Sequence, residues 1–403
     1  MTETARGGLP QGGLPRGGPP WGGPARAGPA RSWLRSLKLS NFRNYASLAL
    51  ALDERMVVLT GPNGAGKTNL MEAVSLLSPG RGLRRASLEV LPRRDGDGTF
   101  AVAAEAETRH GPVALGTGIV NGPEGLEKAR RIRIDHEPVR SSDALLDHLR
   151  VVWLTPDMHG LFRAAPSERR RFLDRLVLAI DRSHASRVSA FERALRSRNK
   201  LLEAPSLNTQ WLSALETQIA ELGTAIAAAR VECVRLLEGI SGASSGEFPK
   251  AELRLEGEVE ASLATLKATD AEDAYQAQLQ ARRYADQAAG RTLNGPHLTD
   301  LLVVHSAKGV AASECSTGEQ KSLLVGIILA HAKLIAELSS EAPIVLLDEV
   351  PAHLDQRHRS ALFEALFALD CQAWMTGTDS LDFQELGQRA QHLSVDAGQV
   401  SPE

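Results

Sequence analysis

One stretch of the sequence has the residue types and the spacing of a phosphate-binding loop. Residues 61–68 read GPNGAGKT and fit the pattern G-x-x-x-x-G-K-[ST]. Glycines let successive backbone N–H groups point at phosphate oxygens, a lysine reaches the β- and γ-phosphates, and a hydroxyl binds Mg²⁺. The pattern therefore predicts a site for a purine nucleoside triphosphate, with Lys67 on the phosphates and Thr68 on the metal. The other expected contacts are Gly61, Pro62, Asn63, Gly64, Ala65, Gly66 and Asn69.

Two adjacent carboxylates follow a short apolar run near the end of the chain. Ile344–Leu347 has the composition of a buried strand, and Asp348 and Glu349 come directly after it. In doubly wound sheets ligands bind at the carboxyl ends of the strands, so we expect both acids near the phosphate loop. Asp348 would hold Mg²⁺ opposite Thr68, and Glu349 would activate the attacking water. Taken alone, the pair also fits two solvated acids at the end of a surface strand.

A third pattern precedes an apolar stretch at residues 323–329. Residues 316–320 read STGEQ, with Ser316 and Glu319 spaced as in a capping box at the start of a helix. A serine hydroxyl, glycine N–H groups and a helix N-terminus also form an anion site, and Gly318 permits close backbone approach. The two interpretations are compatible, because a cap orients the same donors.

The elements that must position these residues alternate between strands and helices, with a helical interruption. An apolar strand at 55–60 leads into the loop, and a helix at 69–77 follows it. A long helical stretch begins at Pro166 and reaches about Gly239, with breaks expected near Pro205 and Gly223. Further strands are expected at 34–39, 48–52, 99–107, 113–120, 129–135, 301–305 and 373–376, and further helices at 270–287 and 356–368.

These elements predict one α/β unit split by a helical insertion. We expect its N-terminal part at 33–165, a helical lobe at 166–290 and its C-terminal part at 291–403. Residues 1–32 are expected to be a disordered tail, because nine Gly and six Pro make up half of the first thirty residues. Such a segment buries too little apolar surface to offset its ordering entropy.

Bulk properties exclude several classes of protein. The formal net charge is −3, so no overall basic character indicates a nucleic-acid partner. The three cysteines lie far apart without a C-x-x-C pair, which argues against a metal site or a disulfide framework. We find no apolar run of about 18 residues and no signal-peptide core, so we expect a cytoplasmic protein with no membrane partner.

One segment is nevertheless basic. Residues 163–200 hold eleven basic and four acidic residues, which suits contacts with DNA phosphates. The alternative is a solvated helix face whose arginine stems lie on apolar neighbours. Few aromatic residues are available to stack bases, so duplex backbone is the expected target. The candidates are Arg169, Arg170, Arg171 and Arg175, with Arg84 and Arg85 as further ones.

The order of phosphate loop, insertion, STGEQ and acid pair resembles the head of ABC-type ATPases. In that superfamily the STGEQ position is the signature motif, which docks on the γ-phosphate held by a partner subunit. The resemblance makes Ser316, Gly318 and Gln320 nucleotide contacts and Asp355 a D-loop residue. Thr376 stands in the region where many relatives place a γ-phosphate-sensing histidine.

Several tags narrow the resemblance to the RecF family of bacterial recombination-mediator ATPases, over residues ~33–395. The chain departs from the family pattern in two places. After the motif GPH at 295–297 it has Leu298, Thr299 and Asp300, where the family usually has an arginine and paired aspartates. The Gly/Pro-rich tail is also additional to the family pattern. The tags are SNFRNY at 40–45, GPNGAGKTN at 61–69, LTPD and RRRFLD within 154–174, GPH at 295–297, STGEQK at 316–321 and LLDEVPAHLD at 346–355.

The resemblance implies an ABC-type, SMC-like ATPase head with an antiparallel β subdomain and a helical lobe. It implies an ATP- and Mg²⁺-dependent homodimer that binds duplex DNA and single-strand/double-strand junctions or gaps, with weak, DNA-stimulated ATP hydrolysis. It implies DNA repair and replication restart with RecR and RecO, loading of the recombinase RecA, and the SOS response. Arg43 and Asn44 are the candidates for contacting adenine.

Three alternatives remain open from the residues alone. An SMC-like chromosome-maintenance ATPase would need heptads sustained over a long insertion, whereas this one is short and interrupted by Pro205 and by the flexible residues 242–246. A transporter ATPase subunit would leave the RRRFLD segment unexplained. A P-loop kinase would need a phosphate acceptor and would form no nucleotide-driven dimer.

Overall fold

The computed structural model describes residues 30–122, 125–126, 129–204, 206–243 and 246–403. Most of the expected tail lies outside these residues. Ala30–Arg31 form strand β1, which pairs in parallel with β15 at Glu341–Ala342, and Ser32 is buried. Residues 30–32 were expected to belong to the disordered tail, and this boundary is wrong because Ala30 and Arg31 pair with β15 and Ser32 is buried.

A mostly parallel sheet forms the centre of the molecule. Only its edge strand β19 runs antiparallel, and four of its strands are buried at every residue, as strands covered on both faces must be. Its order is β11 (Val151–Leu154), β16 (Ile344–Leu347), β17 (Ala373–Thr376), β4 (Met56–Thr60), β18 (Ala390–Asp396) and β19 (Gln399–Pro402).

A second, antiparallel sheet covers one face of the first. Its strand β5 alternates between buried and exposed residues, so one face enters the core and the other faces outward. Its order is β10 (Glu137–Val139), β9 (Arg131–Ile134), β6 (Gly111–Ile119), β5 (Phe100–Thr108), β2 (Trp33–Phe42) and β3 (Tyr45–Ala51).

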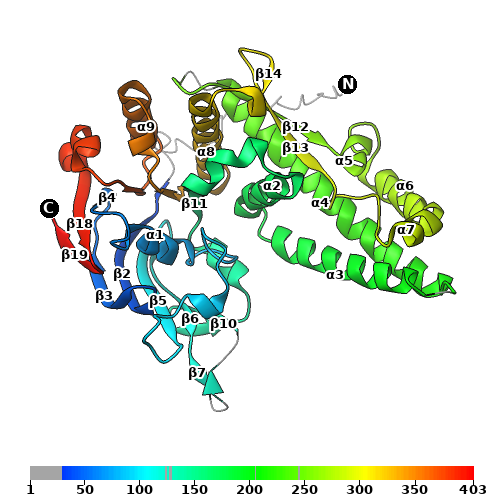
Figure 1. Cartoon of the computed structure of the whole chain (residues 1–403), viewed down its shortest axis with the longest axis horizontal. Coiled ribbons are helices and arrows are strands. Elements are labelled where there is room, and N and C mark those ends of the chain that lie inside the picture. Colours follow the sequence, from blue (N-terminus) through cyan, green and yellow to red (C-terminus); the bar gives the residue numbers. More distant parts are fainter. Residues whose placement is uncertain (1–29, 123–124, 127–128, 205, 244–245) are drawn as a thin grey trace, which may run out of the picture.

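Helices fill the layers on either side of the parallel sheet. Val57 and Leu59 of β4 share a core with α1 (Lys67–Ser75) and the antiparallel sheet, whereas Met56 and Val58 face the core of α8 (Thr317–Ser339) and α9 (Gln356–Ala368). This two-residue alternation places α1 between the sheets and α8 and α9 on the outer face (Figure 1).

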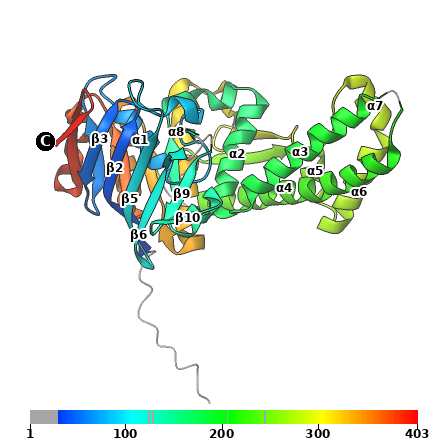
Figure 2. The same ribbon diagram turned by 90° about the horizontal axis from the view of Figure 1, so that it is seen from below.

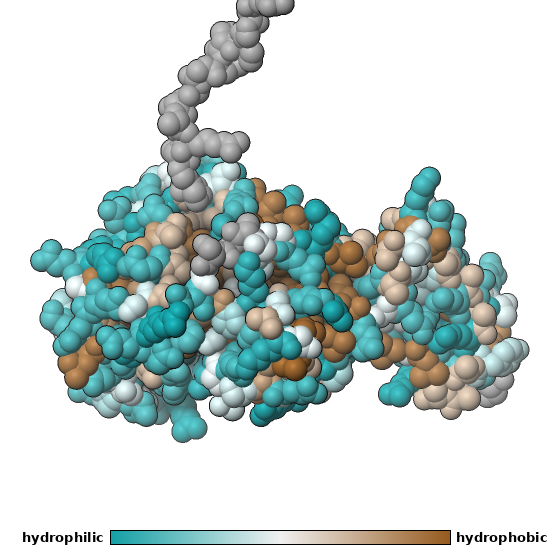
Figure 3. Space-filling model, turned by 90° about the horizontal axis from the view of Figure 1, so that it is seen from above, coloured by the Kyte–Doolittle hydropathy of each residue, from teal (hydrophilic) through white to brown (hydrophobic). Residues whose placement is uncertain are grey.

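A helical lobe extends from this head, and Figures 1 and 3 show the molecule narrowing between the two parts. The long helix α4 joins them, since Val234 and Leu237 lie in the core of the head and Ile219 and Ile226 in that of the lobe. The insertion comprises α2 (Pro166–Ile180), α3 (His184–Leu202), α4 (Thr209–Ala243), β12 (Ala251–Glu256), α5 (Glu258–Ser262), α6 (Ala268–Ala281) and α7 (Arg283–Ala289).

Short elements complete the chain. Strand β12 pairs with β13 (Asp300–His305), which pairs with β14 (Val310–Ala311), and β7 (Asn121–Gly122) pairs with β8 (Gly125–Leu126). The 3₁₀ helices are η1 (Leu88–Val90), η2 (Ser142–Asp147), η3 (Pro156–Arg163), η4 (Ala312–Glu314), η5 (Pro351–His353) and η6 (Ser380–Arg389).

Buried ion pairs tie the lobe together. The fully buried Arg198 of α3 donates to Glu216 of α4 at 3.1 Å and to Asp286 of α7 at 2.7 Å. Removing one partner would leave an uncompensated buried charge, which typically costs about 3–5 kcal/mol. The network therefore fixes how the three helices pack.

The expected helix break at Gly223 is wrong, because α4 continues through it. A Cβ at this position would lie 2.7 Å from Cε1 of Tyr275 and 3.2 Å from Cε2 of Phe191. Glycine at this position therefore allows α6 to pack closely against α4. Pro205, where the other break was expected, lies outside the described residues, and α3 ends at Leu202 and α4 begins at Thr209. A further break separates α2 from α3 at residues 181–183.

The expectation that no apolar run is long enough to cross a membrane also needs correction. Helix α8 has 23 residues, and its most apolar 18-residue window has a mean hydropathy of 1.6, which by length and composition alone would allow a membrane span. Of its most apolar window, 61% is buried inside the molecule. It packs as the core helix of the head, a position that selects the same apolar composition.

We expect Gly223→Ala to lower the thermal unfolding midpoint and Gly239→Ala, in the same helix, to raise it or leave it unchanged. The added methyl at 223 overlaps Tyr275, and overpacking of this kind costs about 1–3 kcal/mol. At 239 nothing lies within 4 Å, so alanine contributes only its better helix propensity, up to about 1 kcal/mol. Equal midpoints for the two variants would contradict the packing argument.

Candidate nucleotide-binding site

The phosphate loop links strand β4 to helix α1 in a backbone conformation that requires glycine. Gly61, Gly64 and Gly66 have φ values of +140°, +82° and +121°. A side chain at Gly61 would overlap the carbonyl oxygen of Val395 in the neighbouring strand β18. These glycines curl the chain so that α1 begins at Lys67, with its N-terminus at the end of the loop.

Residues of the SNFRNY segment hold the loop from outside. The Tyr45 hydroxyl donates to the carbonyl of Gly66 at 3.0 Å, and Asn44 Nδ2 donates to the carbonyl of Ala65 at 3.1 Å. Asn69 Nδ2 donates to Asn44 Oδ1 at 2.7 Å. Burial raises the pKa of Tyr45, so its hydroxyl stays a donor. Asn44 thus lies against the loop, and its contact with adenine stays a prediction.

Arg43 is engaged in an ion pair. Its Nε and Nη2 donate to the buried carboxylate of Glu72, on α1, at 2.8 and 2.7 Å. Arg84 reaches the same carboxylate at 3.3 Å and donates to Asn69 Oδ1 at 2.6 Å. These contacts account for Arg43 and Arg84 by packing, and a role in binding adenine or DNA stays a prediction.

Lys67 is buried and folds back over the loop. Its Nζ donates to the carbonyls of Gly61 and Pro62 at 2.7 and 3.0 Å. Burial lowers the pKa of its ammonium, and the charges of Glu349 and Asp348 oppose that shift. A cation held among backbone N–H groups at a helix N-terminus suits a polyphosphate.

A hydroxyl and a carboxylate converge beside Lys67. Thr68 Oγ1 donates to Asp348 Oδ1 at 3.1 Å, and Thr376 Oγ1 donates to the same oxygen at 2.8 Å. Burial raises the pKa of Asp348, whereas the hydrogen bonds from Thr376 and Thr68 lower it. These hard oxygens fit Mg²⁺, which usually keeps several waters and takes one or two protein ligands. No cluster of three or more His, Cys, Asp or Glu occurs among the described residues.

Glu349 has a strained backbone beside this pair. Its φ is +54°, its N–H donates to Thr376 Oγ1 at 2.8 Å, and its half-exposed carboxylate lies 4.0 Å from Nε2 of His353. Such a conformation is costly for a non-glycine residue, and strained residues of this kind cluster at functional sites. The carboxylate faces a cavity of about 190 Å³ lined by Thr68, Leu83, Arg84, Thr155, Pro156, Asp157, Asp348 and Glu349.

Thr155 and Asp157 were missed as site residues. They follow β11, which pairs in parallel with β16, so they reach the same sheet edge as Asp348. The sequence does carry a signal for them. Val151–Leu154 is apolar throughout and is followed by polar residues, in the same way that Ile344–Leu347 is followed by Asp348. A strand there predicts a ligand-facing loop by the rule that located Asp348.

The predicted capping box is confirmed. Helix α8 begins at Thr317, Glu319 N–H donates to Ser316 Oγ at 3.4 Å, and Ser316 N–H donates to the Glu319 carboxylate at 3.0 Å. An ion pair with Lys308, followed by hydrogen bonds from Ser316, lowers the pKa of Glu319 to about 2. The helix front therefore stays ordered and carries a fixed anion next to its exposed serine.

Signature and D-loop residues meet in a second cavity of about 460 Å³. Ser316, Gly318, His353 and Asp355 line it, and Gly318 is exposed with open space around its Cα. Gln320 is instead buried and donates to the carbonyl of Cys315 at 2.8 Å. The Asp355 carboxylate caps α9 by accepting from the His358 N–H at 2.9 Å. Nucleotide contacts by Gln320 and Asp355 stay predictions.

The two cavities share no lining residue. Thr68, Asp348 and Glu349 line the first, and Ser316 and Gly318 line the second. One chain therefore brings the loop and the acid pair together but keeps its signature residues in a separate cavity.

The arginines expected to bind DNA do not form an exposed face on α2. Arg169 pairs with Asp300 at 2.5 Å, Arg170 donates to the carbonyl of Thr299 at 2.8 Å, and the guanidinium of Arg171 pairs with Glu168. Only Arg171 is half-exposed. Arg169 and Arg170 therefore pack on neighbouring residues, which was the alternative to DNA contact. Their acceptors are Asp300 and the Thr299 carbonyl, in the segment that departs from the family pattern.

Arg175 packs on aromatic rings. Its guanidinium carbon lies 4.7 Å from the centroid of Trp153 and 5.3 Å from that of Phe172. Burial, with a smaller contribution from the charge of Arg85, lowers its pKa to about 9. The sequence could not distinguish such stacking from an exposed cation, and DNA contact by Arg175 stays a prediction.

Comparison with known proteins agrees with this geometry. The head with its capped helix, phosphate loop and acid pair has the α/β fold of ABC/SMC-type heads. The model of the "RecF/RecN/SMC N terminal domain" matches residues 33–386. An Smc head domain with an extended coiled coil from Pyrococcus furiosus superposes with a TM-score of 0.50 at 15% identity, covering 92% of this chain and 95% of that one.

The similarity narrows further within that class. The chain is 53% identical to the DNA replication and repair protein RecF of Mesorhizobium japonicum over 92% of its length and 97% of the relative's. It is 52% identical to the Brucella abortus protein of the same name, over 91% and 96%. A solved structure of the recombination mediator RecF with ATP has a TM-score of 0.81 at 22% identity, covering 94% and 99%. The chain belongs to the RecF family of DNA replication and repair proteins. This membership excludes a transporter ATPase subunit and a P-loop kinase.

We expect Lys67→Ala to abolish measurable ATP binding, because the β- and γ-phosphates lose their fixed counter-ion. Lys308→Ala is the matched control, since it removes a half-exposed lysine that pairs with Glu319 and does not line the first cavity. Calorimetric titration with Mg·ATP tests both variants. Normal affinity in Lys67→Ala would remove the lysine from the site.

Proposed function

We propose that this chain is an ATP-driven homodimer that binds DNA at junctions or gaps and helps to load the recombinase during repair and replication restart. The separation of the two cavities carries the proposal. Thr68 of the phosphate loop lines one cavity, and the signature residues Ser316 and Gly318 line another. A complete nucleotide site would therefore need the loop of one chain and the signature residues of a second copy. A solved relative described as RecF-ATP in the RecFOR pathway supports ATP as the ligand and RecO and RecR as partners.

Each residue of the first half then has a role. Lys67 and the loop N–H groups hold the phosphates, while Thr68 and Asp348 would hold Mg²⁺, which neutralises charge on the phosphate oxygens. The Thr376 hydroxyl donates to Asp348 and accepts from the Glu349 N–H, so one side chain orients both acids. Glu349, partly exposed beside the cavity, would orient or deprotonate the attacking water and give slow hydrolysis.

The second half would act in trans. Ser316 and Gly318 lie exposed at the N-terminus of a 23-residue helix, where partial positive charge favours an anion, and the Ser316 hydroxyl is held there by donating to the Glu319 carboxylate at 2.9 Å. The capping box holds these donors in place before any ligand arrives. Docked on the partner's γ-phosphate, they would make ATP part of the dimer interface.

The DNA-contacting surface is better placed on α3 than on α2. Arg193, Arg196 and Lys200 are exposed, and spacings of three and four residues put them on one helical face. Arg196 has only a loose pairing with Glu192, at 3.8 Å. Figure 2 shows α3 along the surface of the lobe. These cations suit contacts with phosphates that do not depend on base sequence.

A cytoplasmic location belongs to the same proposal. Cys233, Cys315 and Cys371 are all buried and free, as expected in a reducing compartment. Burial raises the pKa of the Cys233 thiol to about 12, so it behaves as a packing residue.

We expect Ser316→Arg to prevent ATP-dependent dimerisation while the monomer still binds ATP, because the added side chain blocks the exposed helix front. Ser47→Arg, at an exposed position of β3, is the matched control. Light scattering with and without Mg·ATP measures the mass of each variant. An unchanged ATP-dependent dimer would reduce Ser316 to a helix cap.

Reversing Arg193, Arg196 and Lys200 to glutamate should weaken duplex binding and lower the salt-dependence slope by about one for each phosphate that is no longer neutralised. Arg235→Glu, at an exposed position of α4 in the same insertion, is the control. Fluorescence anisotropy with a labelled duplex at several salt concentrations provides both quantities. Parent-like affinity and slope in the triple variant would move the DNA surface elsewhere.

A further inference from the structure

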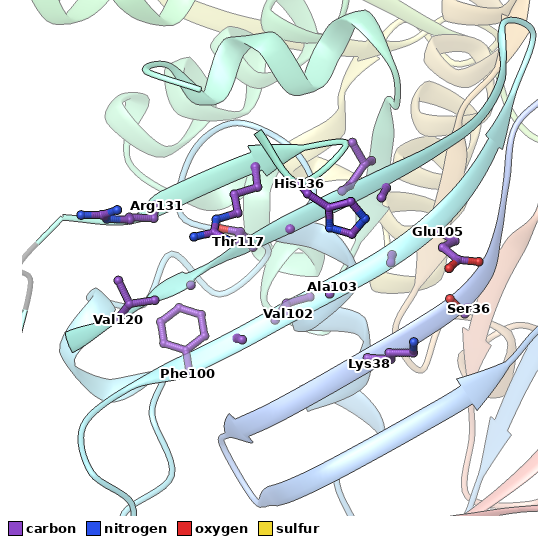
Figure 4. Close-up of a pocket in the computed structure, with 17 residues that line it drawn as sticks. Ser36, Lys38, Phe100, Val102, Ala103, Glu105, Thr117, Val120, Arg131 and His136 are labelled. Atoms are coloured by element: carbon purple, nitrogen blue, oxygen red, sulfur yellow. The ribbon is translucent and has the colours of Figure 1, made fainter. Parts of the chain in front are cut away.

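The outward face of the antiparallel sheet contains a groove remote from the nucleotide site. It has a volume of about 370 Å³ (Figure 4). Its floor consists of small residues on the two central strands, namely Ala101 and Ala103 of β5 and Ala114, Gly116 and Gly118 of β6. Figure 2 shows this face towards the viewer, with no described helix lying over it.

The fold does not require a glycine at the centre of this floor. Gly116 has no left-handed φ, and a Cβ there would meet only Cβ of Arg133, at an ordinary 3.8 Å. Gly118 differs, since a Cβ there would overlap the carbonyl oxygen of Phe100. Glycine and alanine weaken a strand, and a strand glycine often marks close approach by another chain. The sheet itself therefore does not require glycine at 116, and the absence of a side chain there leaves the floor open to a closely approaching ligand.

Basic side chains border the floor on two sides. Lys38 of β2 pairs in register with Ala103, which pairs with Gly116, which pairs with Arg133 of β9. At the usual strand spacing Lys38 and Arg133 are about 14 Å apart. Figure 4 shows Lys38 on one side and Arg131 and His136 on the other. Glu105 is the acidic residue of the lining, near the Ser36 end of the groove.

We propose that this groove binds an amphipathic helix of a partner protein, with small apolar residues on its contact face and acidic residues along both flanks. A helix with its side chains is about 10–12 Å wide, which fits between the two basic borders. The floor is apolar and its backbone groups are used in the sheet ladder, so it offers a phosphate chain no donors between the borders. The charges thus complement an acidic helix better than a nucleic acid.

The test uses the full-length chain without nucleotide, so it does not depend on the proposed ATPase cycle. The probes are a labelled 18-residue helical peptide with Ala and Leu on one face and Glu on both flanks, the same peptide with Lys in place of Glu, and a labelled duplex. Fluorescence anisotropy compares the parent chain with Gly116→Leu, with Lys38→Glu/Arg133→Glu, and with Ser47→Leu as a control on β3.

We expect the parent and Ser47→Leu to bind the acidic peptide and not the basic one. Gly116→Leu should weaken this binding at least tenfold with an unchanged unfolding midpoint, and the double reversal should exchange the preference between the peptides. No binding of the acidic peptide, or equal binding by Gly116→Leu, overturns the proposal. Loss of duplex binding in the double reversal alone, with Gly116→Leu unaffected, would assign the groove to DNA and also overturn it.

Discussion

One buried carboxylate joins the elements on which the site depends. Asp348 directly follows β16, and its Oδ1 accepts from Thr68 of α1 and from Thr376 of β17. Thr68 and Asp348 are 280 residues apart in the chain, and Thr376 lies a further 28 residues on. Because burial disfavours the ionised form, the carboxylate needs these donors or a bound cation to remain charged. The parallel sheet brings them together, and the position of Glu349 depends on the same threonine.

The helical lobe extends this arrangement away from the nucleotide site. Helix α4 contributes residues to the core of the head and to that of the lobe, so the two parts share one continuous element. Arg169 and Asp300 join the start of the insertion to the strand that follows it, 131 residues later. Within the head, the end of α4 packs in the same core as α8.

The sequence predicted features whose determinants are local. The bounds of β16, β17 and α9 were correct, because short apolar runs next to acids and a capped 13-residue helix carry their signals within a few residues. The sequence did not predict features that depend on contacts between residues far apart in the chain. Gly223 depends on Tyr275, Arg169 on Asp300, and β12 on pairing with β13. The head architecture, the capping box and the pairing of Thr68 with Asp348 were therefore predictable, whereas the inward-facing arginines of α2 were not.

Mixing two inactive variants tests the central claim, that each site is shared between two copies. Lys67→Ala removes the loop half, and Ser316→Arg removes the signature half. A heterodimer of the two contains one site with the intact loop of one chain and the intact signature of the other. We expect neither variant alone to hydrolyse ATP and their mixture to recover part of the parent rate, increasing with concentration. No recovery at any concentration, or parent-rate hydrolysis by Ser316→Arg alone, would contradict a shared site.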